Sequence, residues 1–210
     1  MIRIYPSLMA ADLLNLTQEI KRFESLCDGF HIDIMDNHFV PNITFGADIA
    51  NAIGAATSKQ LWIHLMIENP RDFLKKLTVP AKSIISFHTE TVKDHAALIR
   101  DIKARKWLAS ISIKPNTPID TILPVVADLD QVVIMSVEPG FAGQQFLSST
   151  VEKIAPLIAY RTSKNLNFKI GMDGGINKDN IQMLIDKNVD DVAIGSAFFN
   201  NPDWIKKFRK

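Results

Sequence analysis

Two histidines and two aspartates stand near the ends of three short apolar segments. His31 and Asp33 lie in Phe-His-Ile-Asp-Ile-Met, His64 lies in Leu-Trp-Ile-His-Leu-Met, and Asp173 closes Phe-Lys-Ile-Gly-Met-Asp. In an extended chain every second side chain points to the same face, so His31 and Asp33 share a face opposite the isoleucines. Each residue alone is more typical of a structural hydrogen bond than of a ligand. As a set, imidazoles and carboxylates at strand ends predict a metal site that suits zinc or ferrous iron.

The two aspartates also predict proton transfer. Two opposed carboxylates suit the removal of a proton from one face of a carbon and its return to the other face. A C–H beside a ketone is a weak acid, so such a site needs a Lewis acid to polarise the carbonyl and stabilise the enediolate. We expect Met35, Met66 and Met135 to surround that planar intermediate with uncharged thioethers, although each alone is more typical of an ordinary core. The predicted chemistry is epimerisation beside a ketone.

Glycine-rich turns follow the last three predicted strands. Backbone N–H groups approach an anion closely only where side chains do not intrude, and barrels often bind phosphate after strands seven and eight. One such turn is weak evidence, but three neighbouring turns favour a phosphate site over ordinary turn chemistry. Its predicted lining is Gly140, Phe141, Ala142, Gly143, Gly174, Gly175, Gly195 and Ser196.

The elements that position these residues alternate along the chain. Segments rich in β-branched residues predict eight strands, separated mostly by stretches of helical periodicity. Ser149 and Glu152 have capping-box spacing before one of these helices. Eight β/α units in 210 residues favour one domain over 1–210, a closed (β/α)8 TIM barrel, with an open doubly wound sheet as the alternative. The predicted strands are Arg3–Ser7, Gly29–Met35, Leu61–Met66, Ser83–His88, Leu108–Ile113, Gln131–Val137, Phe168–Asp173 and Asp191–Ser196.

Composition narrows the remaining classes of function. Lys and Arg number 24 and Asp and Glu number 23, so no charge excess predicts a nucleic-acid or membrane partner. Cys27 is the single cysteine, which excludes an intrachain disulfide framework and suits a reducing compartment. No stretch has the length of a membrane span, and the N-terminus lacks a signal-like apolar core. We therefore expect a cytoplasmic protein that binds its anionic ligand locally.

The segments that carry these residues, taken together, resemble the ribulose-phosphate 3-epimerase family. The resemblance runs from Pro6 to about Phe198 and keeps the order, spacing and chemistry of the family's motifs. It rests on Pro6–Leu8, His31–Asp36, His38–Asn42, His64–Met66, Met135–Phe141, Asp173–Asn177 and Gly195–Ser196.

The resemblance implies an isomerase of the pentose phosphate pathway that interconverts D-ribulose 5-phosphate and D-xylulose 5-phosphate on a TIM barrel. It implies one divalent ion per subunit, zinc or iron(II), with manganese and cobalt as other candidates. Asp33 would accept the proton and Asp173 donate it in one direction, and Ser7 and His64 would contact the sugar. The family's members form various homo-oligomers, so we expect a homo-oligomer here. The metal ligands by similarity are His31, Asp33, His64 and Asp173.

Two departures from the family's pattern leave the substrate open. Asn37 replaces a common glycine, and asparagine is the next best residue if a positive φ is required. Ala142 stands where many members have glycine, and this variant turn, with Leu8 and Met9, also resembles D-allulose-6-phosphate 3-epimerases.

Other classes of function and other candidate residues have less support. A catalytically silent phosphosugar-binding barrel would keep the turns and lose the metal. A Schiff-base enzyme would need a strand-end lysine, for which Lys114 is the nearest candidate. His88 and Glu90 are read as a pair that fixes a loop by a hydrogen bond.

Overall fold

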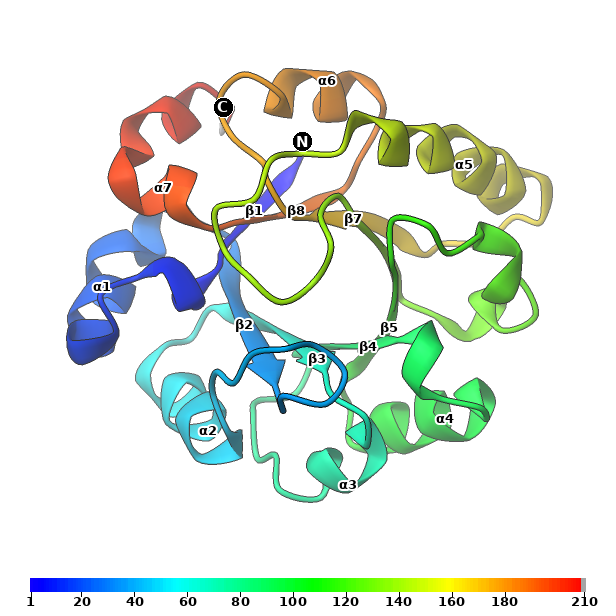
Figure 1. The fold of residues 1–210 in the computed structure, drawn as a ribbon, viewed down its shortest axis with the longest axis horizontal. Helices are drawn as coiled ribbons and strands as arrows, with labels where there is room; N and C mark the ends of the chain where they lie inside the picture. The colour runs from blue at the N-terminus through cyan, green and yellow to red at the C-terminus, as the bar shows by residue number, and fades with distance from the viewer. Residues whose placement is uncertain (209–210) are drawn as a thin grey trace.

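Eight parallel strands form the centre of the molecule and helices surround them (Figure 1). The computed structural model describes residues 1–208. The hydrogen-bonded order is β1-β8-β7-β6-β5-β4-β3-β2, so the predicted (β/α)8 barrel is confirmed. The strands are β1 (Arg3–Pro6), β2 (Gly29–Met35), β3 (Gln60–Met66), β4 (Ile84–His88), β5 (Leu108–Ile113), β6 (Gln131–Met135), β7 (Lys169–Asp173) and β8 (Asp191–Ile194).

The barrel closes where β1 meets β2. Ser7, one residue beyond β1, forms a parallel bridge with His31 of β2. The Asp28 N–H donates to the Ile4 carbonyl at 2.9 Å. The open doubly wound sheet is therefore the wrong alternative. Predicted strand ends differ from the observed ones by at most two residues, chiefly where β6 and β8 pass into loops.

An outer ring of helices covers the strands. Between β5 and β6, however, two short 3-10 turns replace the α-helix. Pro115, Pro118 and Pro124 lie in this segment, and proline interrupts helical hydrogen bonding. The helices are α1 (Leu16–Phe23), α2 (Ala47–Ala56), α3 (Pro70–Leu74), α4 (His95–Ala104), α5 (Ile154–Ser163), α6 (Ile181–Asp186) and α7 (Ser196–Asn200). The 3-10 helices are Leu8–Ala10, Leu13–Asn15, Glu24–Leu26, Thr89–Thr91, Ile119–Thr121, Val126–Asp128, Ser148–Lys153 and Pro202–Phe208.

The predicted capping box before α5 is wrong. Ser149 and Glu152 lie inside the 3-10 helix Ser148–Lys153, and α5 begins only after Lys153, which makes no side-chain cap. No described helix is long and apolar enough to cross a membrane.

Alternation along the strands separates the outer core from the barrel interior. Ile32 and Ile34 belong to the large buried cluster that includes helix residues such as Ile53. Tyr5 and Trp62 belong to a second, smaller cluster formed by inward-facing residues, and their rings meet edge-on with centroids 5.4 Å apart. On the carboxyl side of this second cluster, the inward face of β2 carries polar residues.

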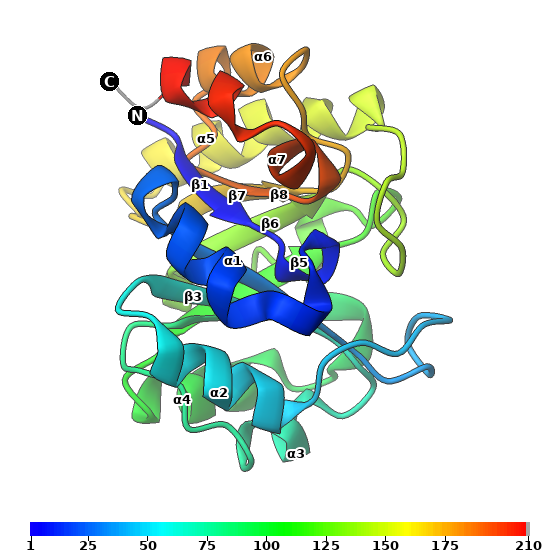
Figure 2. The same ribbon diagram turned by 90° about the vertical axis from the view of Figure 1, so that its left-hand side faces the viewer.

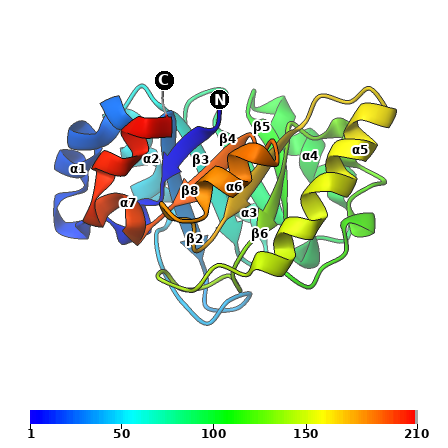
Figure 3. The ribbon, with the colours of Figure 1, turned by 90° about the horizontal axis from the view of Figure 1, so that it is seen from above.

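Two long loops extend from the carboxyl end of the barrel. Residues 36–46 follow β2 and residues 136–147 follow β6, and both project from the same side of the molecule (Figures 2 and 3). The Asn42 side-chain amide donates to the Gly140 carbonyl at 2.7 Å, so the loops are joined. Together they enclose the end of the barrel where the predicted site residues lie.

Candidate active site

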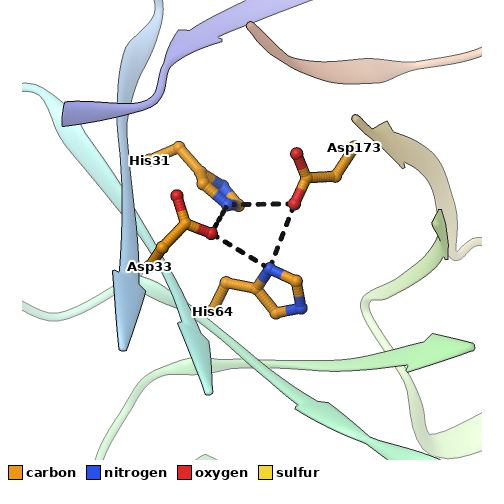
Figure 4. Close-up of side chains that lie close together, drawn as sticks. All are labelled: His31, Asp33, His64 and Asp173. Carbon is orange, nitrogen blue, oxygen red and sulfur yellow. Dashed lines mark hydrogen bonds and ion pairs between the residues drawn. The ribbon is translucent and has the colours of Figure 1, made fainter. Parts of the chain in front are cut away.

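Four side chains from three strands converge at the carboxyl end of the barrel. His31 and Asp33 come from β2, His64 from β3 and Asp173 from β7. One ligand atom from each lies within 4.8 Å of the other three. Figure 4 shows nitrogens and oxygens alternating around a ring, with the two carboxylates on opposite sides. The structure thus brings together all four residues predicted as ligands.

The contacts around this ring are short and similar. His31 Nε2 lies 3.1 Å from Asp33 Oδ1 and 3.3 Å from Asp173 Oδ2. His64 Nδ1 lies 3.4 Å from Asp33 Oδ1 and 3.1 Å from Asp173 Oδ2. The register of the sheet places Asp33 directly beside His64. Ser7 Oγ donates to the other Asp33 oxygen, Oδ2, at 2.6 Å and so orients that carboxylate.

Burial and opposite charge act against each other in this cluster. Burial lowers the pKa of His31, but Asp33 and Asp173 more than compensate and raise it to about 10. Burial raises the pKa of Asp33, whereas contacts with His31 and His64 bring it well below its ordinary value. The pKa of Asp173 is lowered by the same two rings against burial. In the protein without substrate both carboxylates are therefore ionised, and they need positive charge beside them.

The donor set fits a divalent cation. Two ionised, largely buried carboxylates supply two negative charges, and two imidazoles supply nitrogen ligands, a combination typical of zinc and iron(II). His64 Nδ1 is buried and lies 3.1 Å from Asp173 Oδ2. The angles of this contact are not those of a hydrogen bond, so the nitrogen has no hydrogen-bond partner among the described residues. Such a nitrogen is suited to donate a lone pair to an ion held by the same oxygens.

A pocket of about 220 Å³ opens above the two carboxylates. Asp33 and Asp173 line it, whereas His31 and His64 are fully buried behind them. His64, predicted to contact the sugar, is therefore not among the residues that line the pocket. The other predicted substrate contacts all line it: Ser7, Met35, Met66, Met135, Gly140, Phe141, Ala142, Gly143, Gly174, Gly175, Gly195 and Ser196.

The glycines of the turns have conformations and neighbours that exclude larger residues. Gly174 and Gly175 have φ of 114° and 65°. A Cβ on Gly174 would lie 2.4 Å from Val137 Cγ2, and one on Gly175 would lie 2.6 Å from the Phe146 nitrogen. At these turns the backbone borders the pocket and no glycine side chain intervenes. Backbone N–H groups can therefore approach an anion closely, as anion binding requires. Asn37, which replaces a glycine common in the family, has φ of 59°, so this position does require the positive φ that asparagine tolerates.

Sequence reasoning missed several residues at or behind the site. Met9 and Asn177 line the pocket but were not predicted as substrate contacts. His88 is fully buried with Nε2 2.9 Å from His64 Nε2, although it was read as a residue that fixes a loop. The order of the strands could have indicated the contact between His88 and His64, because β4 is the next strand beside β3. Lys114 does not line the pocket; its Nζ lies 4.2 Å from the centre of the Phe39 ring.

Comparison with known proteins adds family relations to this geometry. The model of the Ribulose-phosphate 3 epimerase family matches residues 3–199. The ribulose-phosphate 3-epimerase of Bacillus subtilis is 37% identical over 205 residues, covering 97% of this chain and 94% of that protein. The Mycobacterium tuberculosis protein of that name is 34% identical over 200 residues, covering 95% and 87%. A rice relative, 35% identical over 202 residues and covering 94% and 87%, is named as the cytoplasmic isoform.

Solved structures support the fold independently of these relatives. A mutant tryptophan synthase alpha-subunit from Pyrococcus furiosus superposes with a TM-score of 0.69 at 14% identity, covering 100% of this chain and 98% of that one. Another structure of that subunit gives a TM-score of 0.67 at 12% identity, covering 100% and 96%. At such low identity the likeness shows the barrel fold alone.

Proposed function

Because this chain belongs to the ribulose-phosphate 3-epimerase family, isomerases of carbohydrate phosphates, we propose that it inverts C3 of D-ribulose 5-phosphate by proton transfer between Asp33 and Asp173. The single observation that carries the mechanism is the arrangement of the two carboxylates. They face one another from β2 and β7 at the floor of one pocket (Figure 4).

Each aspartate serves one face of the substrate carbon. Asp33 reacts as the carboxylate and accepts the C3 proton of ribulose 5-phosphate. Asp173 takes up a proton from solvent when the substrate binds and delivers it to the opposite face of the resulting enediolate. Asp33 then releases its proton to solvent, so that both acids return to the ionised state of the free protein. In the reverse direction the two residues exchange roles. Ser7 holds one Asp33 oxygen by its 2.6 Å hydrogen bond, so the carboxylate keeps its orientation while it gains and loses a proton.

A divalent cation held by His31, Asp33, His64 and Asp173 would supply positive charge that makes the C–H beside the ketone more acidic. Zinc and iron(II) suit these ligands best, and manganese or cobalt fit less specifically. Met35 and Met66 line the pocket and form a small apolar cluster with Val40. Their thioethers exclude water from the reacting carbon without adding charge.

The turns after β6, β7 and β8 form the phosphate end of the pocket in this proposal. Gly143, Gly175 and Gly195 line this end of the pocket, where their backbone N–H groups would bind the phosphate without obstruction from side chains of their own. Ser196 is the first residue of α7, where N–H groups have no partner within the helix. Ala142 lines the same end, and together with Leu8 and Met9 it leaves D-allulose 6-phosphate as the alternative substrate.

A coupled assay with substitutions of both acids tests the proposal. Wild-type protein is offered ribulose 5-phosphate and allulose 6-phosphate in parallel, beside Asp33→Asn and Asp173→Asn. We expect a preference for the pentose and a loss of activity in each variant of at least the 10²–10⁴-fold order typical of a lost general acid or base. Metal content is measured in every sample, because each variant also alters a proposed ligand.

The outcomes of that assay are distinct. Full activity in either metal-loaded variant contradicts the proton transfers. Faster turnover of allulose 6-phosphate assigns the chain to hexose substrates instead.

We also propose a cytoplasmic location, in line with the name of the rice relative. We further propose that the protein forms a homo-oligomer, which sedimentation analysis tests.

A further inference from the structure

A second histidine lies directly behind the candidate metal site. His88 ends β4 and is fully buried. Its Nε2 lies 2.9 Å from His64 Nε2, and the two rings stack with centroids 5.0 Å apart and planes inclined by 23°. Because an imidazole–imidazole hydrogen bond needs one donor and one acceptor, only one of these two nitrogens carries the shared proton.

Glu90 determines which nitrogen that is. Its Oε1 accepts from the Lys114 backbone N–H at 2.9 Å and from the Thr117 hydroxyl. Its Oε2 lies 3.2 Å from His88 Nδ1. An ionised carboxylate has no proton to donate and can only accept a hydrogen bond, so the proton between Glu90 and His88 is on His88 Nδ1. In neutral His88 the other nitrogen, Nε2, is then an acceptor.

The hydrogen bond from His64 follows from this. His64 donates through Nε2–H to His88, and in neutral His64, the form that binds a metal ion, this leaves Nδ1 without a proton. That nitrogen is the one that faces Asp33 and Asp173. The order of bonds is therefore His64 Nε2–H to His88 Nε2, and His88 Nδ1–H to Glu90.

We propose that His88 and Glu90 are positioning residues that hold His64 in the tautomer and orientation required to bind a divalent cation through Nδ1. The inference rests on the metal site of the proposed function and deepens it. Partners of this kind behind a ligating histidine typically change metal affinity by about 10–100-fold. His31 has no such support, because its Nδ1 has no hydrogen-bond partner among the described residues.

The contacts of Glu90 also allow a simpler role, in which it only fixes the loop after β5. Glu90→Gln separates the two roles. The Lys114 N–H still needs an acceptor, so the amide oxygen of Gln turns toward it and the NH2 group faces His88. His88 must then accept at Nδ1 and donate from Nε2, which reverses the bond to His64 and places a proton on His64 Nδ1.

Thr117→Val is the matched control. It removes the hydroxyl that binds the same carboxylate but leaves the contact between Glu90 and His88 in place. His88→Phe is a second test, since it keeps an aromatic ring behind His64 and removes both nitrogens. Far-UV circular dichroism and thermal unfolding establish that each variant is folded.

The experiment measures the Zn2+ affinity of each full-length protein by competition with a chromogenic chelator, and the protonation of His64 by 15N NMR of the histidine rings. We expect Glu90→Gln and His88→Phe to bind Zn2+ about 10–100-fold more weakly than wild type. Thr117→Val should bind within about twofold of wild type while losing some thermal stability. The wild-type spectrum should show His64 protonated at Nε2.

Two results overturn the inference and are distinguishable. If folded Glu90→Gln and His88→Phe bind Zn2+ as tightly as wild type, the pair only fixes a loop, and the proposed function stands. If wild-type protein takes up no ion at all, the metal site of the proposed function fails and this inference fails with it.

Discussion

Gly175 is a position where an added methyl group would meet both an unfavourable backbone conformation and a close contact with backbone atoms. Its φ of 65° is left-handed, which costs a non-glycine residue about 1–2 kcal/mol. An added Cβ would lie 2.6 Å from the Phe146 nitrogen and 2.7 Å from its Cα. Both are backbone atoms and cannot move away by a side-chain rotation, so overpacking adds about 1–3 kcal/mol. Gly175→Ala should therefore lower the free energy of unfolding by about 2–5 kcal/mol.

Gly143→Ala is the matched control in the same pocket. Gly143 also has a positive φ, 76°, but a Cβ there meets no atom within 4 Å. Only the conformational cost of about 1–2 kcal/mol applies. Urea unfolding followed by circular dichroism compares both variants with wild type at equal metal content. Equal destabilisation of the two variants would refute the reasoning, since it would mean that the contact with Phe146 has no cost.

Three further predictions concern the metal, the pH and the far end of the barrel. Removal of the ion with a chelator should lower the free energy of unfolding, by about 3 kcal/mol when free metal was at a hundredfold excess over Kd, and calorimetry should show the Tm recover on reloading. The pKa of His31 is raised from 6.5 to about 10, so its contribution to the stability of the metal-free protein is complete below pH 6.5 and is lost as the pH rises toward 10. Metal binding must displace the proton from His31. Titration calorimetry in two buffers with different enthalpies of ionisation should therefore give different heats of metal binding, whereas identical heats after correction for dilution would contradict proton release. Asp191→Ala removes the partner of Arg3 and Gln131 at the opposite end of the barrel from the pocket, and should cost about 2–4 kcal/mol in urea unfolding while kcat changes less than about twofold.

Much of the fold could be predicted because its signals are local. The alternation of His31 and Asp33 with isoleucines identifies a strand with one polar face, and β2 has the predicted bounds. Eight such segments in one short chain indicated a barrel, as observed. The prolines after β5 were a local signal too, and they account for the missing helix there. The capping box failed because Ser149 and Glu152 match a spacing that the 3-10 helix before α5 overrides.

The sequence by itself determined which residue types stand at the strand ends, and hence the metal and acid–base chemistry that we propose. Only the tertiary structure decided which of those residues meet. Closure of the barrel through Ser7 and His31 brings β7 across from β2, and the register of β2 with β3 places Asp33 beside His64. His88 contacts His64 because β4 pairs with β3. The residues next to either histidine in the sequence do not indicate this pairing. Strand alternation depends on neighbours in the chain, whereas pairing and closure depend on the packing of residues far apart in sequence.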